Sequence, residues 1–135
     1  MEKGKLTRNQ LQEKLMVCTY QYLFYLSIGE KQSLEDLLLS SFNTSPQEVD
    51  KFAKDYLLEM IPNLSDMVIK IEPLLNKWTF KRLKLIEQAL LILGYCEYTY
   101  LEIPKPIVIN VCVKLAQKYA DEDSYKFINA VLENI

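Results

Sequence analysis

Length, composition and charge exclude several classes of protein before any pattern is considered. The chain has 135 residues, half of them hydrophobic, which suffices for one domain with one core, and we predict that domain over residues 1–135. Only three glycines occur, which favours an all-α fold over a turn-rich β protein. A formal net charge of −2 excludes a protein that binds nucleic acid through overall positive charge, so such binding must use local patches.

Residues typical of catalytic and metal sites are scarce. No histidine is present, which removes the commonest general base and metal ligand, and the glycines are too dispersed for a phosphate-binding loop. Cys18, Cys96 and Cys112 are too far apart in sequence for a local metal knuckle, and we interpret them as small core residues in a reducing cytoplasm. We therefore expect a protein that is not an enzyme and uses no cofactor or metal.

Targeting and membrane-spanning segments are not expected either. The first eight residues contain no apolar core, so they do not resemble a secretory signal. The longest apolar run, residues 89–96, is well short of the roughly 20 residues that cross a bilayer. We expect a cytoplasmic protein that does not enter a membrane.

Hydrophobic periodicity predicts about seven helices. They cover, in chain order, residues 6–28, 34–42, 46–61, 64–75, 83–96, 108–119 and about 122–135. Gly29 is placed to end the first helix, and Ser33 is placed to cap the second. Ser45 followed by Pro46 predicts the start of the third, and Pro62 is expected to separate it from the fourth.

The later helices have different signals. Thr79 is placed to cap the fifth helix, whose residues 83–96 are apolar on most sides and are therefore expected to be enclosed. Two prolines separate it from the sixth, and Asp121 or Asp123 is placed to cap the seventh. We interpret the three consecutive acids there as complements to the positive end of that helix, in preference to a site for a hard cation.

Basic residues gather in two places. One group lies at the N-terminus and consists of Lys3, Lys5 and Arg8. The other falls within eight residues that include no acid, and consists of Lys77, Lys81, Arg82 and Lys84.

Three parts of the chain have the order and spacing of one family's motifs. They lie in the first helix, in the centre and at the C-terminus. The matching pieces are Glu13 with Tyr20-Gln21-Tyr22; Trp78, Arg82-Leu83 and IEQALL at 86–91; and IPKPIVIN at 103–110 with EDSYKFINAVL at 122–132. In these pieces the chain resembles the NusB family, whose patterns read RE-x-A-x-Q-x-LYQ, W-x-x-x-RL-x-x-IE-x-AIL, IP-x-x-V-x-INE and EDS-x-KFVNGVL.

The resemblance implies a fold, a function and partners. NusB proteins are two small helical subdomains packed into a compact bundle, and they bind single-stranded boxA-type RNA jointly with the ribosomal protein NusE. The implied role is transcription antitermination in ribosomal RNA transcription, with other elongation factors and RNA polymerase as further partners and no membrane. The chain is expected to be a monomer or a homodimer.

The resemblance also assigns roles to particular residues. The implied RNA-binding residues are Lys3, Lys5, Arg8, Ser124, Lys126 and Phe127, and the implied partner-binding residues are Glu97 and Tyr98. Chemistry supports two of them, because a lysine can meet a phosphate and an exposed aromatic ring can stack on an unpaired base. The spacing of Phe127 and Val131 is, however, more typical of a core helix. We expect the last helix to lie beside the first, so that the cationic residues converge.

Departures from the family pattern leave an alternative. Asn9, Gln10 and Gln12 occupy positions where many members have arginine, and Val111 and Lys114 replace glutamates. Losing about three arginines removes up to three phosphate contacts, which predicts weaker RNA affinity or dependence on the partner protein. The alternative is a protein interaction module that keeps the fold and has lost RNA binding. A third reading, an accessory domain like that of RNA methyltransferases, is disfavoured because no cofactor-binding domain follows.

Overall fold

Every regular element in the described part of the chain is helical. The computed structural model describes residues 6–44 and 47–135, which contain six α-helices and two short 3₁₀ helices. In chain order these are α1 (Arg8–Ser27), α2 (Leu34–Phe42), α3 (Lys51–Ile71), η1 (Glu72–Leu75), η2 (Phe80–Arg82), α4 (Leu85–Thr99), α5 (Lys105–Tyr119) and α6 (Glu122–Glu133). The predicted all-α class is confirmed, and the predicted count of seven helices is one too many.

The miscount arises at Pro62, which lies inside α3 and does not end it. A proline inside a helix costs about 3 kcal/mol, because it removes a backbone hydrogen bond and crowds the preceding turn. Here the proline is on the exposed side, and the helix buries Tyr56 and Met60 before it and Met67 after it. The continuous buried face therefore holds together the two helices that the sequence predicted as separate.

Two predicted helix starts are also corrected. Ser45 and Pro46 lie outside the described residues, and α3 begins only at Lys51, where the Asp50 carboxylate accepts a hydrogen bond from the Phe52 N–H at 2.8 Å. Thr79 precedes η2 instead of capping α4, which begins at Leu85. The Glu87 carboxylate fixes this later start by accepting the Lys84 N–H at 3.1 Å.

Three other predicted ends are confirmed. Ser33 caps α2, with reciprocal hydrogen bonds to Asp36 of 3.0 and 3.1 Å. Asp121 caps α6 by accepting the Ser124 N–H at 2.8 Å. Gly29 follows the last residues of α1 with a φ of +84°, a conformation that favours glycine. The short polar side chains of Ser33 and Asp121, and the glycine at position 29, therefore predicted these helix ends correctly.

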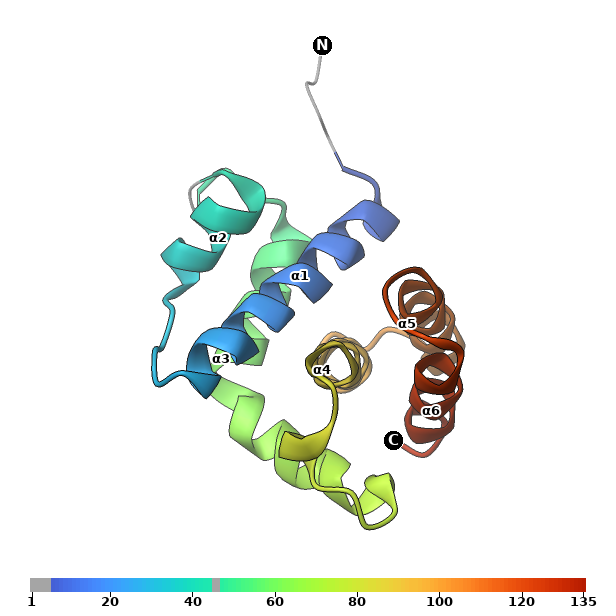
Figure 1. Cartoon of the computed structure of the whole chain (residues 1–135). Helices are drawn as coiled ribbons and strands as arrows, with labels where there is room; N and C mark the ends of the chain where they lie inside the picture. Colours follow the sequence, from blue (N-terminus) through green and yellow to red (C-terminus); the bar gives the residue numbers. More distant parts are fainter. Residues whose placement is uncertain (1–5, 45–46) are drawn as a thin grey trace.

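Helix α4 lies at the centre of the molecule. Figure 1 views it nearly along its axis, with α1 and α3 on one side and α5 and α6 on the other, and it contacts all four. Residues 89–94 are all buried, which confirms the predicted enclosure. At Gly94 an added Cβ would lie 2.9 Å from a methyl group of Leu132, so this glycine lets α6 approach α4 closely.

The cysteines belong to this interior. Cys18, Cys96 and Cys112 are buried free thiols. Burial raises the pKa of Cys18 to about 11 and raises the pKa values of Cys96 and Cys112 as well. Among the described residues, no helix combines the length and the apolar character needed to cross a membrane.

Candidate nucleic-acid interface

The N-terminal basic group is described only in part. Lys3 and Lys5 lie outside the described residues, whereas Arg8 begins α1 and is exposed. Its guanidinium carbon lies 3.8 Å from the centroid of the Phe52 ring of α3, a cation–π contact that orders the side chain. Arg8 therefore offers an ordered positive charge at the N-terminal end of α1.

A groove with several polar lining residues runs between the start of α1 and α5. It has a volume of about 200 Å³ and is lined by Asn9, Glu13, Asn110, Val111, Lys114, Leu115 and Lys118. Asn110, Lys114 and Lys118 are spaced four residues apart, so they share one face of α5. This face carries two lysines that the sequence analysis did not include in the site.

The two lysines of this groove differ in their partners. Lys118 lies 2.8 Å from the Glu13 carboxylate, which also accepts a hydrogen bond from the Tyr119 hydroxyl. These two hydrogen bonds lower the pKa of Glu13. Lys114 is exposed and forms no ion pair with any residue in the ranges 6–44 and 47–135, so its charge is available to a ligand.

A second groove adjoins the first, between α5 and α6. It has a volume of about 330 Å³ and is lined by Pro106, Ile109, Asn110, Val113, Tyr125, Lys126 and Asn129. Asn110 lines both grooves, which therefore form one surface that we call the α5 surface. Lys126 is exposed and pairs with Glu122 at 2.8 Å, an exposed pair of the kind that contributes little and that a phosphate can replace.

Helix α5 links the two ends of the chain on this side. It packs against both α1 and α6 (Figure 1), so the expectation that α6 itself lies beside α1 is replaced by an arrangement with α5 as the link. The lysines of α5 could have been found from their spacing of four residues. The sequence alone did not indicate which helix would meet α1.

Two residues expected at the surface are buried instead. The Ser124 hydroxyl donates to the Glu87 carboxylate at 2.7 Å, and the Glu97 carboxylate accepts two hydrogen bonds of 3.1 Å from the Gln12 amide. Both Ser124 and Glu97 have a relative exposure of 0%. Neither side chain can touch a ligand from these positions, because each is used to join α4 to another helix.

Burial strongly perturbs the carboxyl group of Glu97. It raises the pKa of Glu97 to about 7, against the opposing effects of the Gln12 hydrogen bond and the Arg8 charge. Gln12 Oε1 is also buried, and it has no hydrogen-bond partner among the described residues.

The remaining predicted residues are accessible. Tyr98 is 36% exposed, and the Lys105 ammonium lies 5.4 Å from the centroid of its ring. Phe127 is half-buried, packs against the core and lines a pocket with Trp78. Phe127 therefore contributes to the core, as its spacing predicted, and also keeps part of its ring accessible in the pocket.

An apolar patch lies on the face of α1 that turns away from the core. Val17, Tyr20 and Phe24 are 44%, 40% and 46% exposed, and their spacing places them on one face. Beside them is a groove of about 460 Å³ lined by Met16, Val17, Tyr20, Lys84, Leu85, Ile86 and Tyr119. Exposed apolar patches that continue into a groove are typical of protein contact sites.

An all-α bundle with a lysine and amide surface beside an apolar patch defines a class of small helical binding proteins. The comparisons with known proteins give the particular family. The family model for the NusB family matches residues 16–135, and the chain belongs to that family.

The relatives match over most of their lengths. The transcription antitermination protein NusB of Pediococcus pentosaceus is 35% identical over 134 residues, covering 96% of this chain and 97% of its own length. A solved structure of T. maritima NusB superposes with a TM-score of 0.81 at 25% identity, covering 97% of this chain and 91% of that one. A structure of the antitermination factors NusB and NusE with double-stranded RNA has a TM-score of 0.67 at 23% identity, covering 94% and 93%, and shows the fold.

Proposed function

We propose that this protein is a transcription antitermination factor that binds boxA-type single-stranded RNA together with the ribosomal protein NusE. Membership of the NusB family and the relatives' name as antitermination proteins support this role. A structural neighbour contains NusB, NusE and double-stranded RNA in one complex, which supports NusE and RNA as classes of partner. The role requires binding alone, in the cytoplasm, and needs no catalytic group.

The observation that carries the RNA-binding part is the α5 surface. It brings Lys114 and Lys118 of α5 and Lys126 of α6 into two adjoining grooves, together with the amide groups of Asn9 and Asn110. Lysines can neutralise phosphates, and amide side chains can hydrogen-bond to phosphates, riboses or base edges. Two adjoining grooves with both kinds of group fit a single strand better than a flat charged patch.

The α5 surface also makes the missing arginines less important for RNA binding. Gln12 is buried, so its lack of charge removes nothing from the surface. Lys114, which stands where the family pattern has a glutamate, reverses a charge within the groove. We therefore propose that cationic contacts have moved from α1 toward α5, so that the RNA-binding function is kept.

The apolar patch on α1 is the face that we propose for NusE. Val17, Tyr20 and Phe24 present a row of accessible apolar side chains, as interface cores do. A Val17→Glu variant should lose NusE in a pull-down while keeping affinity for RNA alone. Unchanged NusE capture would move the partner face elsewhere, and Tyr98→Ala tests the site at the end of α4 that the resemblance implies.

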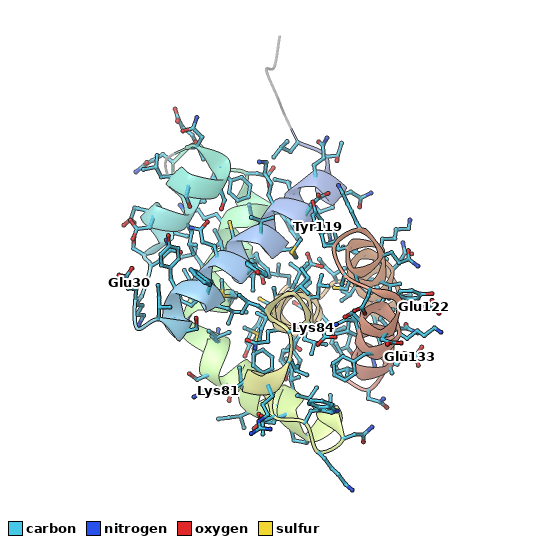
Figure 2. All side chains as sticks on the ribbon, viewed as in Figure 1. Glu30, Lys81, Lys84, Tyr119, Glu122 and Glu133 are labelled. Carbon is cyan, nitrogen blue, oxygen red and sulfur yellow. The ribbon has the colours of Figure 1, made fainter. Side chains whose placement is uncertain are left out.

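A titration tests the proposed RNA surface. Fluorescence anisotropy of a labelled boxA RNA, at low salt and with or without NusE, should give a binding curve that Lys114→Glu and Lys126→Glu each weaken several-fold. The matched control is Lys31→Glu, since Lys31 is exposed and follows Glu30, which Figure 2 shows on the opposite side from α6. Full RNA affinity in a variant that carries both Lys114→Glu and Lys126→Glu would overturn the assignment of RNA binding to the α5 surface. Capture of NusE without any RNA binding by the wild type would favour the protein interaction module.

A further inference from the structure

A fourth pocket lies where the segment before α4 meets α6. It has a volume of about 340 Å³ and is lined by Trp78, Arg82, Leu83, Lys84, Glu87, Asp123 and Phe127. This volume falls in the range of about 300–1,000 Å³ that is usual for small-ligand sites. Figure 2 labels Lys81 and Lys84 on the segment before α4 and Glu122 near the start of α6, which locate the two walls.

The first wall is an exposed tryptophan on an anchored loop. Trp78 is the only tryptophan of the chain and is 58% exposed. Asn76 and Lys77 before it have φ values of 48° and 76°, a left-handed conformation that is uncommon for lysine. Phe80 after it is buried, and its N–H donates to the Glu72 carboxylate at 2.7 Å. The Trp78 N–H donates to the Leu75 carbonyl at 3.2 Å, so hydrogen bonds hold the loop on both sides while its largest apolar side chain faces solvent.

The second wall is the half-buried ring of Phe127 on α6. Within residues 6–44 and 47–135, the rings of Trp78 and Phe127 do not form an aromatic pair with each other. Both rings nevertheless line the same pocket, so the space between the two walls is open to a third group. A flat aromatic or heteroaromatic ring is the group that such walls favour.

The charged residues of the pocket differ in whether they already have a partner within the protein. Arg82 forms no ion pair with any described residue, whereas Lys84 is paired with Asp121 at 2.7 Å. Both carboxylate oxygens of Glu87 accept hydrogen bonds from the protein, one from the Lys84 N–H and one from the Ser124 hydroxyl. Arg82 is therefore the cation free to meet a phosphate, and Asp123 is an acceptor free to meet an N–H group of a base.

We infer that this pocket binds one unpaired nucleotide of the bound RNA, with its base stacked on Trp78 and its phosphate at Arg82. The inference rests on the proposed function and extends the RNA path from the α5 surface around α6 to the segment before α4. A base, a phosphate and base N–H groups match the aromatic wall, the guanidinium and the carboxylate of the pocket. An acidic peptide would use the cation and leave the aromatic walls without a partner.

The single tryptophan makes a direct test possible. Trp78 emission should be quenched as boxA RNA saturates the full-length protein, in step with the anisotropy of the labelled RNA. An abasic oligonucleotide of the same length should bind more weakly and leave the emission nearly unchanged. Equal quenching by the abasic strand or by poly-glutamate would overturn the assignment of a base.

Substitutions give the second arm of the test. Trp78→Ala should weaken RNA binding by about fivefold or more, the lower end of what one base stack contributes, and Trp78→Phe should restore most of the affinity. Leu39→Ala is the control, because Leu39 of α2 is an apolar residue that is 65% exposed and lines none of the grooves described above, so it should leave RNA affinity unchanged. Wild-type affinity in Trp78→Ala, together with no quenching of Trp78 emission when the wild type binds RNA, would overturn this site while the proposed function stands. No RNA binding by the wild type or by any variant, even with NusE, would overturn both this site and the proposed function.

Discussion

Two neighbouring residues of α1 attach that helix to different parts of the molecule in opposite ways. Gln12 faces inward and hydrogen-bonds to Glu97 of α4, which has a relative exposure of 0%. Glu13 faces outward and pairs with Lys118 of α5, with 29% of its own side chain exposed. Each contact contains one glutamate. Burial raises the pKa of Glu97, whereas hydrogen bonds lower the pKa of Glu13.

The difference shows which polar contacts serve the fold and which serve binding. A buried carboxylate costs stability when it is charged, so Glu97 favours the folded state most when it is protonated. An exposed pair contributes little, and Glu13 mainly lowers the positive charge that the α5 surface offers. The interior contact should therefore dominate stability, and the surface contact should dominate RNA affinity.

The largest expected effect is a loss of stability as pH rises. The pKa of Glu97 is raised from 4.5 to about 7 in the folded protein, so its favourable contribution is complete below the unfolded value and is lost as pH rises through 7. The shift corresponds to about 3 kcal/mol. Urea unfolding at pH 5 and pH 8 should show this loss in the wild type, and Glu97→Gln should remove most of it. An equal pH dependence in both proteins would contradict the assignment.

Removing the interior partner should have the next largest effect. Gln12→Leu leaves the Glu97 carboxyl buried without its hydrogen-bond donor, and we expect a loss of about 2 kcal/mol at pH 8. The loss should be smaller at pH 5, where Glu97 is neutral. Gln117→Leu, at an exposed position of α5, serves as the control in the same unfolding experiment. Equal losses in the two variants would show that the interior hydrogen bond has no special weight.

The surface contact should affect binding. Glu13→Gln releases Lys118 and removes a negative charge from the α5 surface, which should raise RNA affinity about fivefold at low salt. The dependence of log affinity on log salt should steepen by up to one unit, since one more phosphate contact becomes available. Glu133→Gln is the control, because Glu133 is exposed near the end of α6. An unchanged or weaker affinity would place the RNA away from this groove.

The smallest expected effect is that of the same variant on folding. Glu13→Gln should change Tm by no more than about 2 °C near neutral pH, because exposed ion pairs contribute little. The lowered pKa of Glu13 gives the wild type stability above the unfolded value, and that stability is lost as pH falls through the folded value. The small difference between wild type and Glu13→Gln should therefore be present near neutral pH and vanish at acid pH. Thermal melts from pH 3 to 7 measure it, and a large loss at pH 7 would remove the contrast with Gln12→Leu.

The sequence predicted local features of the fold better than the effects of packing. The caps at Ser33 and Asp121 and the glycine after α1 depend on neighbours within a few residues, and the structure contains all three. Pro62 was expected to end a helix, but the buried face on both sides of it outweighs the local cost. Local signals therefore failed where residues distant in sequence determined the conformation.

The candidate site divides in the same way. The family resemblance led to Lys126 and Phe127, which are accessible, and equally to Ser124 and Glu97, which are buried by contacts between distant helices. Nothing in the sequence around Lys114 places it across from Asn9, since that proximity arises only when α5 packs against α1. The spacing of four residues along α5 was the one available signal.

The buried thiols have a practical consequence for following this protein. Because Cys18, Cys96 and Cys112 are enclosed and their pKa values are raised, they should react slowly with maleimides near neutral pH. A new cysteine at an exposed position such as Lys31 should then take a fluorophore selectively, with all three native cysteines left in place. Distance measurements between that dye and a labelled transcript can follow assembly in the native chain.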